Sequence, residues 1–241
     1  MIKITDTVKH LIIINVLFFI VTYVMKNAEL SSQLAMHYPS SPQFKPWQII
    51  SHMFMHGSET HLLFNMLALW MFGSSVEQMI GRNKFLILYF ASGIGAVLIN
   101  AGVDYFQFNT IYTKLVNLGM STSEINKIVE TVLPYGQGYV NETYQSIYRI
   151  YHTPLVGASG ALYGVMVAFG VLQPKAKMGL LFLPIMIEAR IFIPLILLAD
   201  VFFGVFSVKG DNIAHFAHIG GAIVGFILIW SLKKHKFKRW Y

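Results

Sequence analysis

The sequence is poor in charged residues and contains no cysteine. Only 12% of its 241 residues are Asp, Glu, Lys or Arg, whereas 55% are hydrophobic. A soluble domain carries about a quarter charged residues, so this composition leaves too little polar surface to cover a soluble globule. The lack of cysteine excludes disulfide bonds, a thiol nucleophile and zinc sites built on thiolates. The composition therefore predicts a membrane protein without a disulfide framework.

Long apolar runs predict six membrane spans. The expected spans are Val8–Met25, His61–Ile80, Phe85–Val103, Ser159–Leu172, Ile191–Phe206 and Ile213–Leu232. No small-residue cleavage site follows the first run, so we expect it to be a retained span rather than a signal peptide. The predicted fold is an all-α integral membrane protein, a bundle of six helices that forms a single domain over residues 1–241.

One long polar stretch, residues 105–153, separates the third and fourth expected spans as an extramembrane loop. Within it, Ser121 and Glu124 have the spacing of a helix capping box. Apolar residues follow at helical spacing, namely Ile125, Ile128, Val129 and Val132. The pattern favours a short amphipathic helix on the membrane surface or against the bundle, and ordinary loop packing is the alternative.

The positive charges predict the orientation of the bundle. An even number of spans places both termini on one side, and twelve of the 18 Lys and Arg residues fall on that side. This bias favours cytoplasmic termini in a multi-pass protein, which we expect in a bacterial cytoplasmic membrane. The basic tail KKHKFKRWY could contact anionic headgroups. The net charge of +7 is therefore assigned to the membrane, and no nucleic-acid partner is expected.

The stretch VGASGALYG, residues 156–164, places a serine between glycines at the start of the fourth expected span. That span ends before Pro174, so about 14 residues cover only about 21 Å of a bilayer core about 30 Å thick. If its far end lies at the cytoplasmic face, Ser159 lies about 10 Å below the outer surface. Irregular backbone at that depth is tolerated only against protein or a water-filled cavity. We therefore expect Ser159 at the bottom of a wet pocket that opens to the outside.

His218 lies about 8 Å below the start of the sixth expected span, a depth similar to that of Ser159. Small-xxx-small pairs let helix backbones approach closely in lipid. The fourth and sixth spans each carry such a pair, Gly160 with Gly164 and Gly221 with Gly225. The pattern predicts that the serine hydroxyl meets the imidazole at one depth.

This pairing suits acyl transfer, because a neutral imidazole can accept the serine proton and later protonate the leaving amine. The reaction also needs donors for the developing oxyanion. His61 and Asn65 share one face of the second span, and the backbone N–H of Ser159 at a helix N-terminus is a third donor. Tyr163, one turn after the serine, could orient the imidazole by stacking. No acidic residue is expected beside His218 at this depth, which favours a Ser-His dyad over a triad.

Three separated segments resemble the signature segments of the rhomboid family of intramembrane serine proteases: GASGALYG, HGSETHLLFNMLALWMFGSSVE and AHFAHIGGAIVG. The resemblance covers residues 52–230 and implies a rhomboid-like bundle of six helices. The family's Gly-x-Ser-Gly motif matches Gly157, Ser159 and Gly160, which implies Ser159 as the nucleophile. The family's tyrosine one turn later matches Tyr163.

The family's histidine motif, His-x-x-Gly-x-x-x-Gly, matches His218, Gly221 and Gly225, which implies His218 rather than His215 as the base. The family's His-x-x-x-Asn motif matches His61 and Asn65 in the second span, the two expected side-chain donors to the oxyanion. The resemblance implies a serine endopeptidase that hydrolyses peptide bonds in or near the transmembrane segments of other membrane proteins. No cofactor and no metal are implied.

Taken singly, these residues also fit structural roles. A serine among glycines often serves helix packing, a membrane histidine is often a satisfied core residue, and Asn65 could bond between helices. His52 and His56 are assigned to hydrogen bonding in loops and at helix ends, and His215 to packing or bonding at the rim of the site. Asp200 is an intramembrane acid and so a candidate functional residue, although a structural pairing with a backbone or tyrosine group is more common.

Two other functions stay open. Two histidine pairs, at positions 52 and 56 and at positions 215 and 218, have the spacing of metal ligands and would suit a metal-dependent hydrolase. In that case the serine and its glycines would have no role. A non-catalytic rhomboid-like protein that binds and escorts membrane proteins is the second alternative. Such relatives lack the serine or the histidine, whereas this chain has both.

Overall fold

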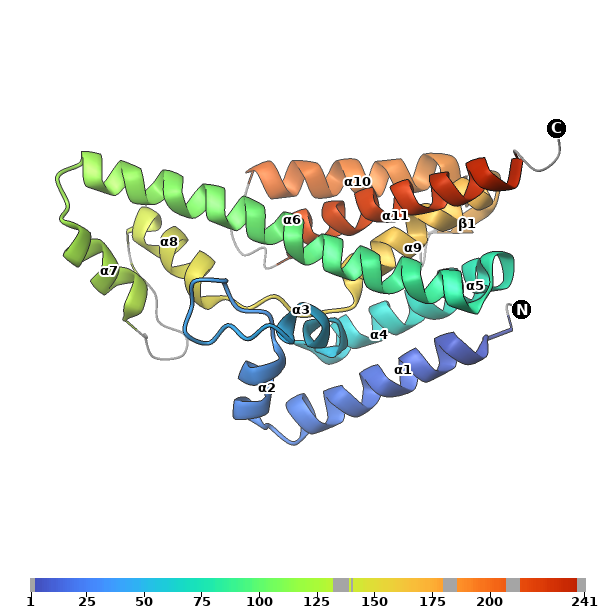
Figure 1. The fold of residues 1–241 in the computed structure, drawn as a ribbon, viewed down its shortest axis with the longest axis horizontal. Helices are drawn as coiled ribbons and strands as arrows, with labels where there is room; N and C mark the ends of the chain where they lie inside the picture. The colour runs from blue at the N-terminus through green and yellow to red at the C-terminus, as the bar shows by residue number, and fades with distance from the viewer. Residues whose placement is uncertain (1–2, 132–138, 140, 180–185, 207–212, 238–241) are drawn as a thin grey trace.

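The computed structural model describes residues 3–131, 139, 141–179, 186–206 and 213–237. The helices in these ranges are α1 (Asp6–Phe19), η1 (Ile20–Val24), α2 (Ala28–Leu34), α3 (Gln48–Ser51), η2 (His52–Phe54), α4 (Glu59–Ala68), η3 (Leu69–Gly73), α5 (Ser74–Ile80), α6 (Arg82–Asn117), α7 (Thr122–Glu130), α8 (Glu142–His152), α9 (Ser159–Leu172), α10 (Ala189–Phe206) and α11 (His215–Phe237). Two short antiparallel strands, β1 (Lys177–Gly179) and β2 (Met186–Glu188), pair between α9 and α10, with Met178 opposite Ile187. Figure 1 shows the long helices running side by side.

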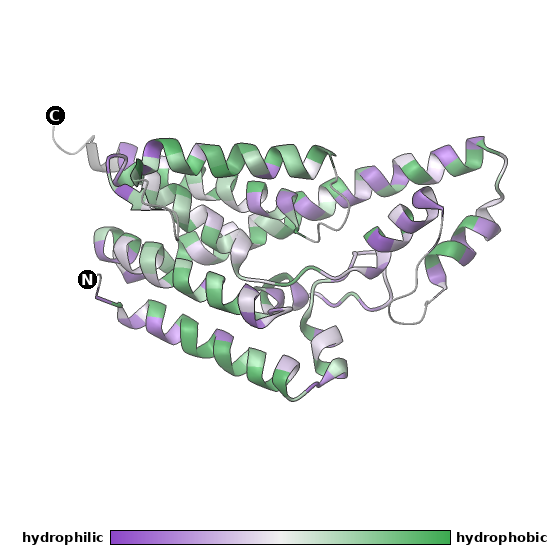
Figure 2. Cartoon of the chain, turned by 180° about the vertical axis from the view of Figure 1, so that it is seen from behind, coloured by the Kyte–Doolittle hydropathy of each residue, from purple (hydrophilic) through white to green (hydrophobic). Residues whose placement is uncertain are grey.

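Four helices in the described part of the chain are long and apolar enough to cross a membrane: Asp6–Val24, Arg82–Asn117, Ala189–Phe206 and His215–Lys234. Helix α9 is apolar but has only 14 residues, as the sequence predicts. The second expected span is divided into the consecutive helices α4, η3 and α5. Figure 2 shows hydrophobic residues concentrated on these helices. Each expected span corresponds to helical structure, and the count of six spans stays a prediction.

Glycines allow α9 and α11 to pack backbone to backbone. A Cβ atom added to Gly221 would lie 1.8 Å from the carbonyl oxygen of Gly160. One added to Gly225 would lie 2.4 Å from the Cα atom of Gly164. Both distances are too short for any side chain, so the predicted close approach of the two small-xxx-small faces is confirmed. Helix α6 packs against the same part of α9, where Ala96 faces Gly160.

The stretch between the third and fourth expected spans is largely helical. Helix α6 continues to Asn117, well beyond the expected end of the third span at Val103. Helix α8 was not expected. Its first turn is capped by the side chain of Asn141, which accepts hydrogen bonds from the backbone N–H groups of Thr143 and Tyr144. The extension of α6 and α8 together give α7 two surfaces on which to pack.

The predicted amphipathic helix is present as α7 and begins with the predicted capping box. The Ser121 N–H donates to Glu124 Oε2 at 2.8 Å, and the Glu124 N–H donates to Ser121 Oγ at 3.3 Å. Hydrogen bonds from Ser121 lower the pKa of Glu124. The apolar face of α7 packs against α6 and α8 in a small buried cluster of Leu115, Ile125, Ile128, Val129 and Ile147. Val132, the last residue of the predicted stripe, lies outside the described residues.

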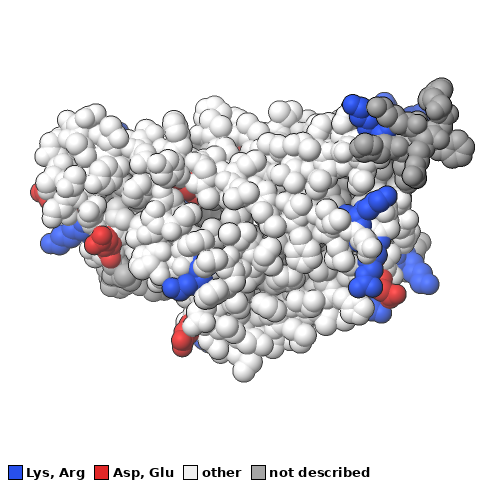
Figure 3. Space-filling view, viewed as in Figure 1, with Lys and Arg blue, Asp and Glu red and all other residues white. Residues whose placement is uncertain are grey.

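Both termini lie at the same end of the molecule, opposite the end that carries α7 (Figure 1). Figure 3 shows Lys and Arg side chains gathered at this end. The buried carboxylate of Glu77 in α5 fixes the start of the chain there, because it accepts hydrogen bonds from the hydroxyls of Thr5 and Thr7. Of the residues in the charge count, Lys209, Lys238 and Arg239 lie outside the described residues.

Candidate active site

Ser159 is the first residue of α9, so its backbone N–H has no acceptor within the helix. The chain reaches it through Gly157, whose φ of +126° is a conformation that residues with a side chain rarely adopt. A Cβ atom at this position would also lie 2.8 Å from Nε2 of His61. The Gly157 N–H donates to the carbonyl oxygen of His52 at 2.9 Å. These constraints place the serine beside the start of α4.

His218 lies in the first turn of α11 with its ring directed at the serine. Its Nε2 atom is 2.9 Å from Ser159 Oγ, and the side chain is buried. The ring of Tyr163 stacks on the imidazole, with centroids 4.2 Å apart and planes 10° from parallel. The contact and the stacking that the sequence predicts are therefore both present.

Helix α4 brings the two expected oxyanion donors to the same place. Ser58 caps the helix by accepting a hydrogen bond from the His61 N–H at 3.1 Å. The His61 ring lies against Gly157, as the short distance above shows. Asn65 follows one turn later and is buried, and its Nδ2 atom has no hydrogen-bond partner among the described residues. The His61 ring thus lies beside the serine segment, and Asn65, one turn along the same helix, has a buried donor with no partner among the described residues.

The expectation that no acidic residue lies beside His218 is wrong. The Oδ1 atom of Asp200, in α10, lies 3.0 Å from His218 Nδ1 and 2.6 Å from His215 Nδ1. All three side chains are buried. The bond to His215 agrees with the role expected for that residue.

The sequence carries a signal for the depth of Asp200, although not for the face of α10 on which it lies. Asp200 lies six residues before the end of α10 at Phe206, or about 9 Å along the helix. His218 lies three residues after the start of α11, and the segment between the two helices is short. When two successive helices are antiparallel and joined by a short connection, residues at similar distances from the connection lie at similar depths.

The comparison with known proteins agrees with the three segments named above. The rhomboid domain family matches residues 43–235. This chain belongs to the rhomboid family. Helices α3 to α10 and all but the last two residues of α11 lie within the matched region, whereas α1 and α2 precede it.

Individual relatives include both bacterial and mitochondrial rhomboids. Rhomboid protein 1, mitochondrial, of Saccharomyces cerevisiae is 29% identical over 188 residues, which cover 77% of this chain and 42% of that protein. Rhomboid protease AarA of Providencia stuartii is 28% identical over 195 residues, 80% of this chain and 58% of that protein. Rhomboid protease GlpG of Klebsiella pneumoniae is 34% identical over 84 residues, 35% of this chain and 30% of that protein. This chain thus spans about half the length of the first two.

The rhomboid site also contains a set of side chains that could ligate a metal. Asp200, His215 and His218 each offer one ligand atom, and these atoms lie within 4.8 Å of one another. The other expected histidine pair does not join this group in the described residues. His52 Nδ1 bonds to the carbonyl oxygen of Gln48 at 2.9 Å, and His56 packs edge-on against the ring of His61.

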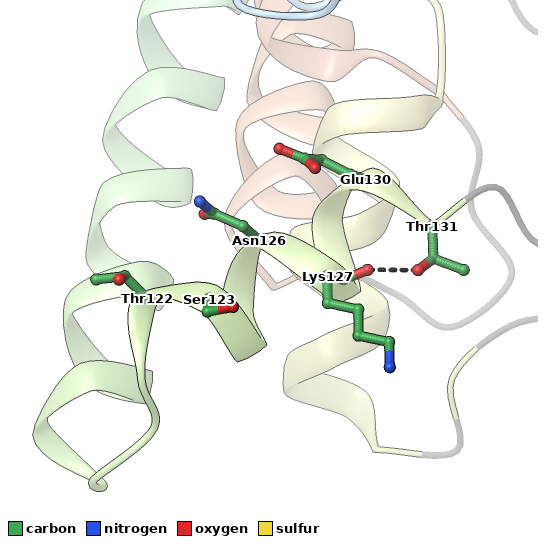
Figure 4. Close-up of a pocket in the computed structure, with 6 residues that line it drawn as sticks. All are labelled: Thr122, Ser123, Asn126, Lys127, Glu130 and Thr131. Atoms are coloured by element: carbon green, nitrogen blue, oxygen red, sulfur yellow. Dashed lines mark hydrogen bonds between the residues drawn. The ribbon is translucent and has the colours of Figure 1, made fainter.

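Ser159 does not line either of two hollows formed by the described residues of this rhomboid. One, of about 540 Å³, is lined by residues of α2 and by His56, Gly57 and Val156, which adjoin the site. The other, of about 690 Å³, lies on the surface of α7 (Figure 4). Its lining side chains include no serine paired with a histidine. The Thr131 hydroxyl there donates a hydrogen bond to the carbonyl oxygen of Lys127. The wet pocket expected above Ser159 stays a prediction.

Proposed function

We propose that this rhomboid is an intramembrane serine endopeptidase that hydrolyses peptide bonds in or near the transmembrane segments of other membrane proteins. The observation that carries this proposal is the 2.9 Å contact between Ser159 Oγ and His218 Nε2. Because imidazole accepts a proton through an unprotonated ring nitrogen, this geometry suits removal of the hydroxyl proton during nucleophilic attack. Relatives named as rhomboid proteases support the same activity.

In the first half-reaction Ser159 Oγ attacks the carbonyl carbon of the scissile bond while its proton passes to His218 Nε2. The carbonyl oxygen becomes an oxyanion, and the side chains of Asn65 and His61 with the Ser159 N–H donate hydrogen bonds to it. The carbon–nitrogen bond then breaks, and the imidazolium gives its proton to the leaving amine. An acyl-enzyme ester remains on the serine.

In the second half-reaction a water molecule attacks the ester carbonyl while His218 accepts one of its protons. The ester bond breaks, the new carboxylic acid leaves, and the imidazolium returns the proton to Ser159 Oγ. The cycle ends with both side chains in their starting forms, and every bond and proton is accounted for by Ser159, His218, the substrate and water.

We further propose that the chain forms one domain of six membrane spans in a bacterial cytoplasmic membrane, with both termini in the cytoplasm. The location of the termini at the same end of the molecule supports this arrangement (Figure 1). Transmembrane proteins of the same bilayer are then the substrates.

The proposal is tested with purified protein in liposomes that also contain a model transmembrane substrate. We expect the wild type to cleave the substrate and to be labelled by a fluorophosphonate probe. Ser159→Ala should do neither, whereas Ser146→Ala, a change at an exposed serine of α8, should behave as the wild type. Cleavage at the wild-type rate by Ser159→Ala would overturn the proposal. Loss of wild-type cleavage in a chelator would favour the metal-dependent alternative, and a wild type that binds the substrate without cleavage or labelling would favour the escort alternative.

A further inference from the structure

The carboxylate of Asp200 occupies the side of the His218 ring that faces away from the serine. Its Oδ1 atom is 3.0 Å from His218 Nδ1, and only 5% of Asp200 is exposed. An ionised carboxylate can only accept hydrogen bonds, so the imidazole must carry a proton on Nδ1 to form this contact. In a neutral imidazole the other nitrogen, Nε2, is then unprotonated. Nε2 is the atom that lies 2.9 Å from Ser159 Oγ.

Two further contacts keep this arrangement in place. The stacked ring of Tyr163 restricts the imidazole to one plane. His215, one turn before His218 on α11, directs its Nδ1 atom at the same carboxylate oxygen at 2.6 Å. The carboxylate is therefore held by one histidine while it contacts the other.

We infer that Asp200 is a positioning residue that holds His218 in the tautomer and orientation in which Nε2 accepts the Ser159 proton. This inference rests on the proposed function. During the acyl-transfer steps the imidazolium carries protons on both nitrogens, and Asp200 accepts the Nδ1–H hydrogen bond throughout without taking the proton. The site then works as a Ser-His-Asp arrangement supplied by α9, α11 and α10, in place of the dyad that the sequence favours.

A purely structural explanation is that Asp200 only ties α10 to α11. Removal of the carboxylate would then lower stability, and any loss of activity would follow the loss of folded protein. A positioning role predicts a different result for Asp200→Asn, which preserves the size of the side chain. The asparagine amide can donate to Nδ1, and this donation selects the tautomer with a proton on Nε2, which cannot act as a base. In a soluble serine protease the equivalent change lowers kcat about 10⁴-fold.

The experiment compares wild type and Asp200→Asn in liposomes by kcat, KM, the rate of fluorophosphonate labelling and the unfolding midpoint. We expect kcat and the labelling rate to fall about 10²- to 10⁴-fold, with KM changed little in protein that stays folded. Asp104→Asn is the matched control, because its carboxylate accepts a hydrogen bond from Asn100 within α6 and lies outside the site. This control should keep the wild-type kcat. Wild-type kcat and labelling in Asp200→Asn would overturn the inference while the proposed function stands.

A second measurement uses the unmodified protein and does not depend on the folding of a variant. Nitrogen-15 NMR of the labelled histidines should show His218 protonated at Nδ1 and unprotonated at Nε2 in the resting wild type. A resting His218 with its proton on Nε2 would overturn the inference. A wild type that neither cleaves nor labels would instead contradict the proposed function itself.

Discussion

At the scale of single residues, the buried amide of Asn65 fits the oxyanion role proposed for it. Its Nδ2 atom has no hydrogen-bond partner among the described residues, and an unpaired buried donor costs about 1–3 kcal/mol. Such a cost is offset in an enzyme when the donor stabilises a transition state. His61, one turn earlier, lies beside Gly157, two residues before Ser159.

We therefore predict that Asn65→Ala and His61→Ala each lower kcat about 10- to 10³-fold. The KM for a transmembrane substrate should change little, because the neutral carbonyl of the bound substrate makes weak use of these donors. Steady-state kinetics in liposomes measure both constants, and Asn109→Ala, at an exposed amide of α6, is the control. An unchanged kcat would show that the two residues serve packing, and a change in KM alone would place them in the substrate groove.

At the scale of elements, the contact between α9 and α11 sets the distance between the Ser159 hydroxyl and the His218 ring. The two helices touch through backbone atoms at Gly160 and Gly221, so the interface has no space for a methyl group. Because Ser159 and His218 lie within one turn of these glycines, a shift of either helix changes the distance between Ser159 Oγ and His218 Nε2. Packing at this interface therefore controls the geometry of that contact.

Gly221→Ala should lower the free energy of unfolding by about 1–3 kcal/mol or more, since the added Cβ would lie 1.8 Å from a carbonyl oxygen. Activity should fall with it. The matched control is Gly102→Ala in α6, where an added Cβ meets no atom within 4 Å and the change favours the helix by up to about 1 kcal/mol. Unfolding midpoints in detergent measure the effect, and equal midpoints for the two variants would contradict this account of the interface.

At the scale of the whole molecule, the distribution of charge and the shared position of the termini predict one orientation in the bilayer. The end that carries the termini is rich in Lys and Arg, and the unit of α7, α8 and the extended α6 lies at the opposite end (Figures 1 and 3). Positively charged segments are retained on the cytoplasmic side. The unit around α7 should therefore face the outside.

The chain lacks cysteine, so single cysteines report this orientation without background. We predict that a membrane-impermeant maleimide labels Ser123→Cys, on the exposed side of α7, in intact bacterial cells or in right-side-out membrane vesicles. Lys3→Cys, near the start of α1, should be labelled only after the membrane is permeabilised. The reverse pattern would contradict the orientation, and labelling of both sites in intact membranes would contradict the three spans expected between them.

The sequence by itself determined those features of the protein that depend on neighbouring residues. Hydropathy located the long apolar helices, the spacing of Ser121 and Glu124 predicted the start of α7, and the glycine pairs predicted close packing of α9 and α11. The contact between Ser159 and His218 was also predictable, because the two depths follow from helix geometry and the glycines specify which faces meet.

Only the tertiary structure decided which side chain lies behind His218. Whether Asp200 faces that ring, a lipid chain or a backbone group depends on the rotation of α10 about its own axis, and α10 has no glycine pair that specifies its packing face. The length of α6 was decided in the same way, because its last turns bury Leu115 against α7 and α8 rather than against lipid. Local patterns specify which helices form, whereas the rotation of one helix relative to another depends on contacts between residues far apart in the chain.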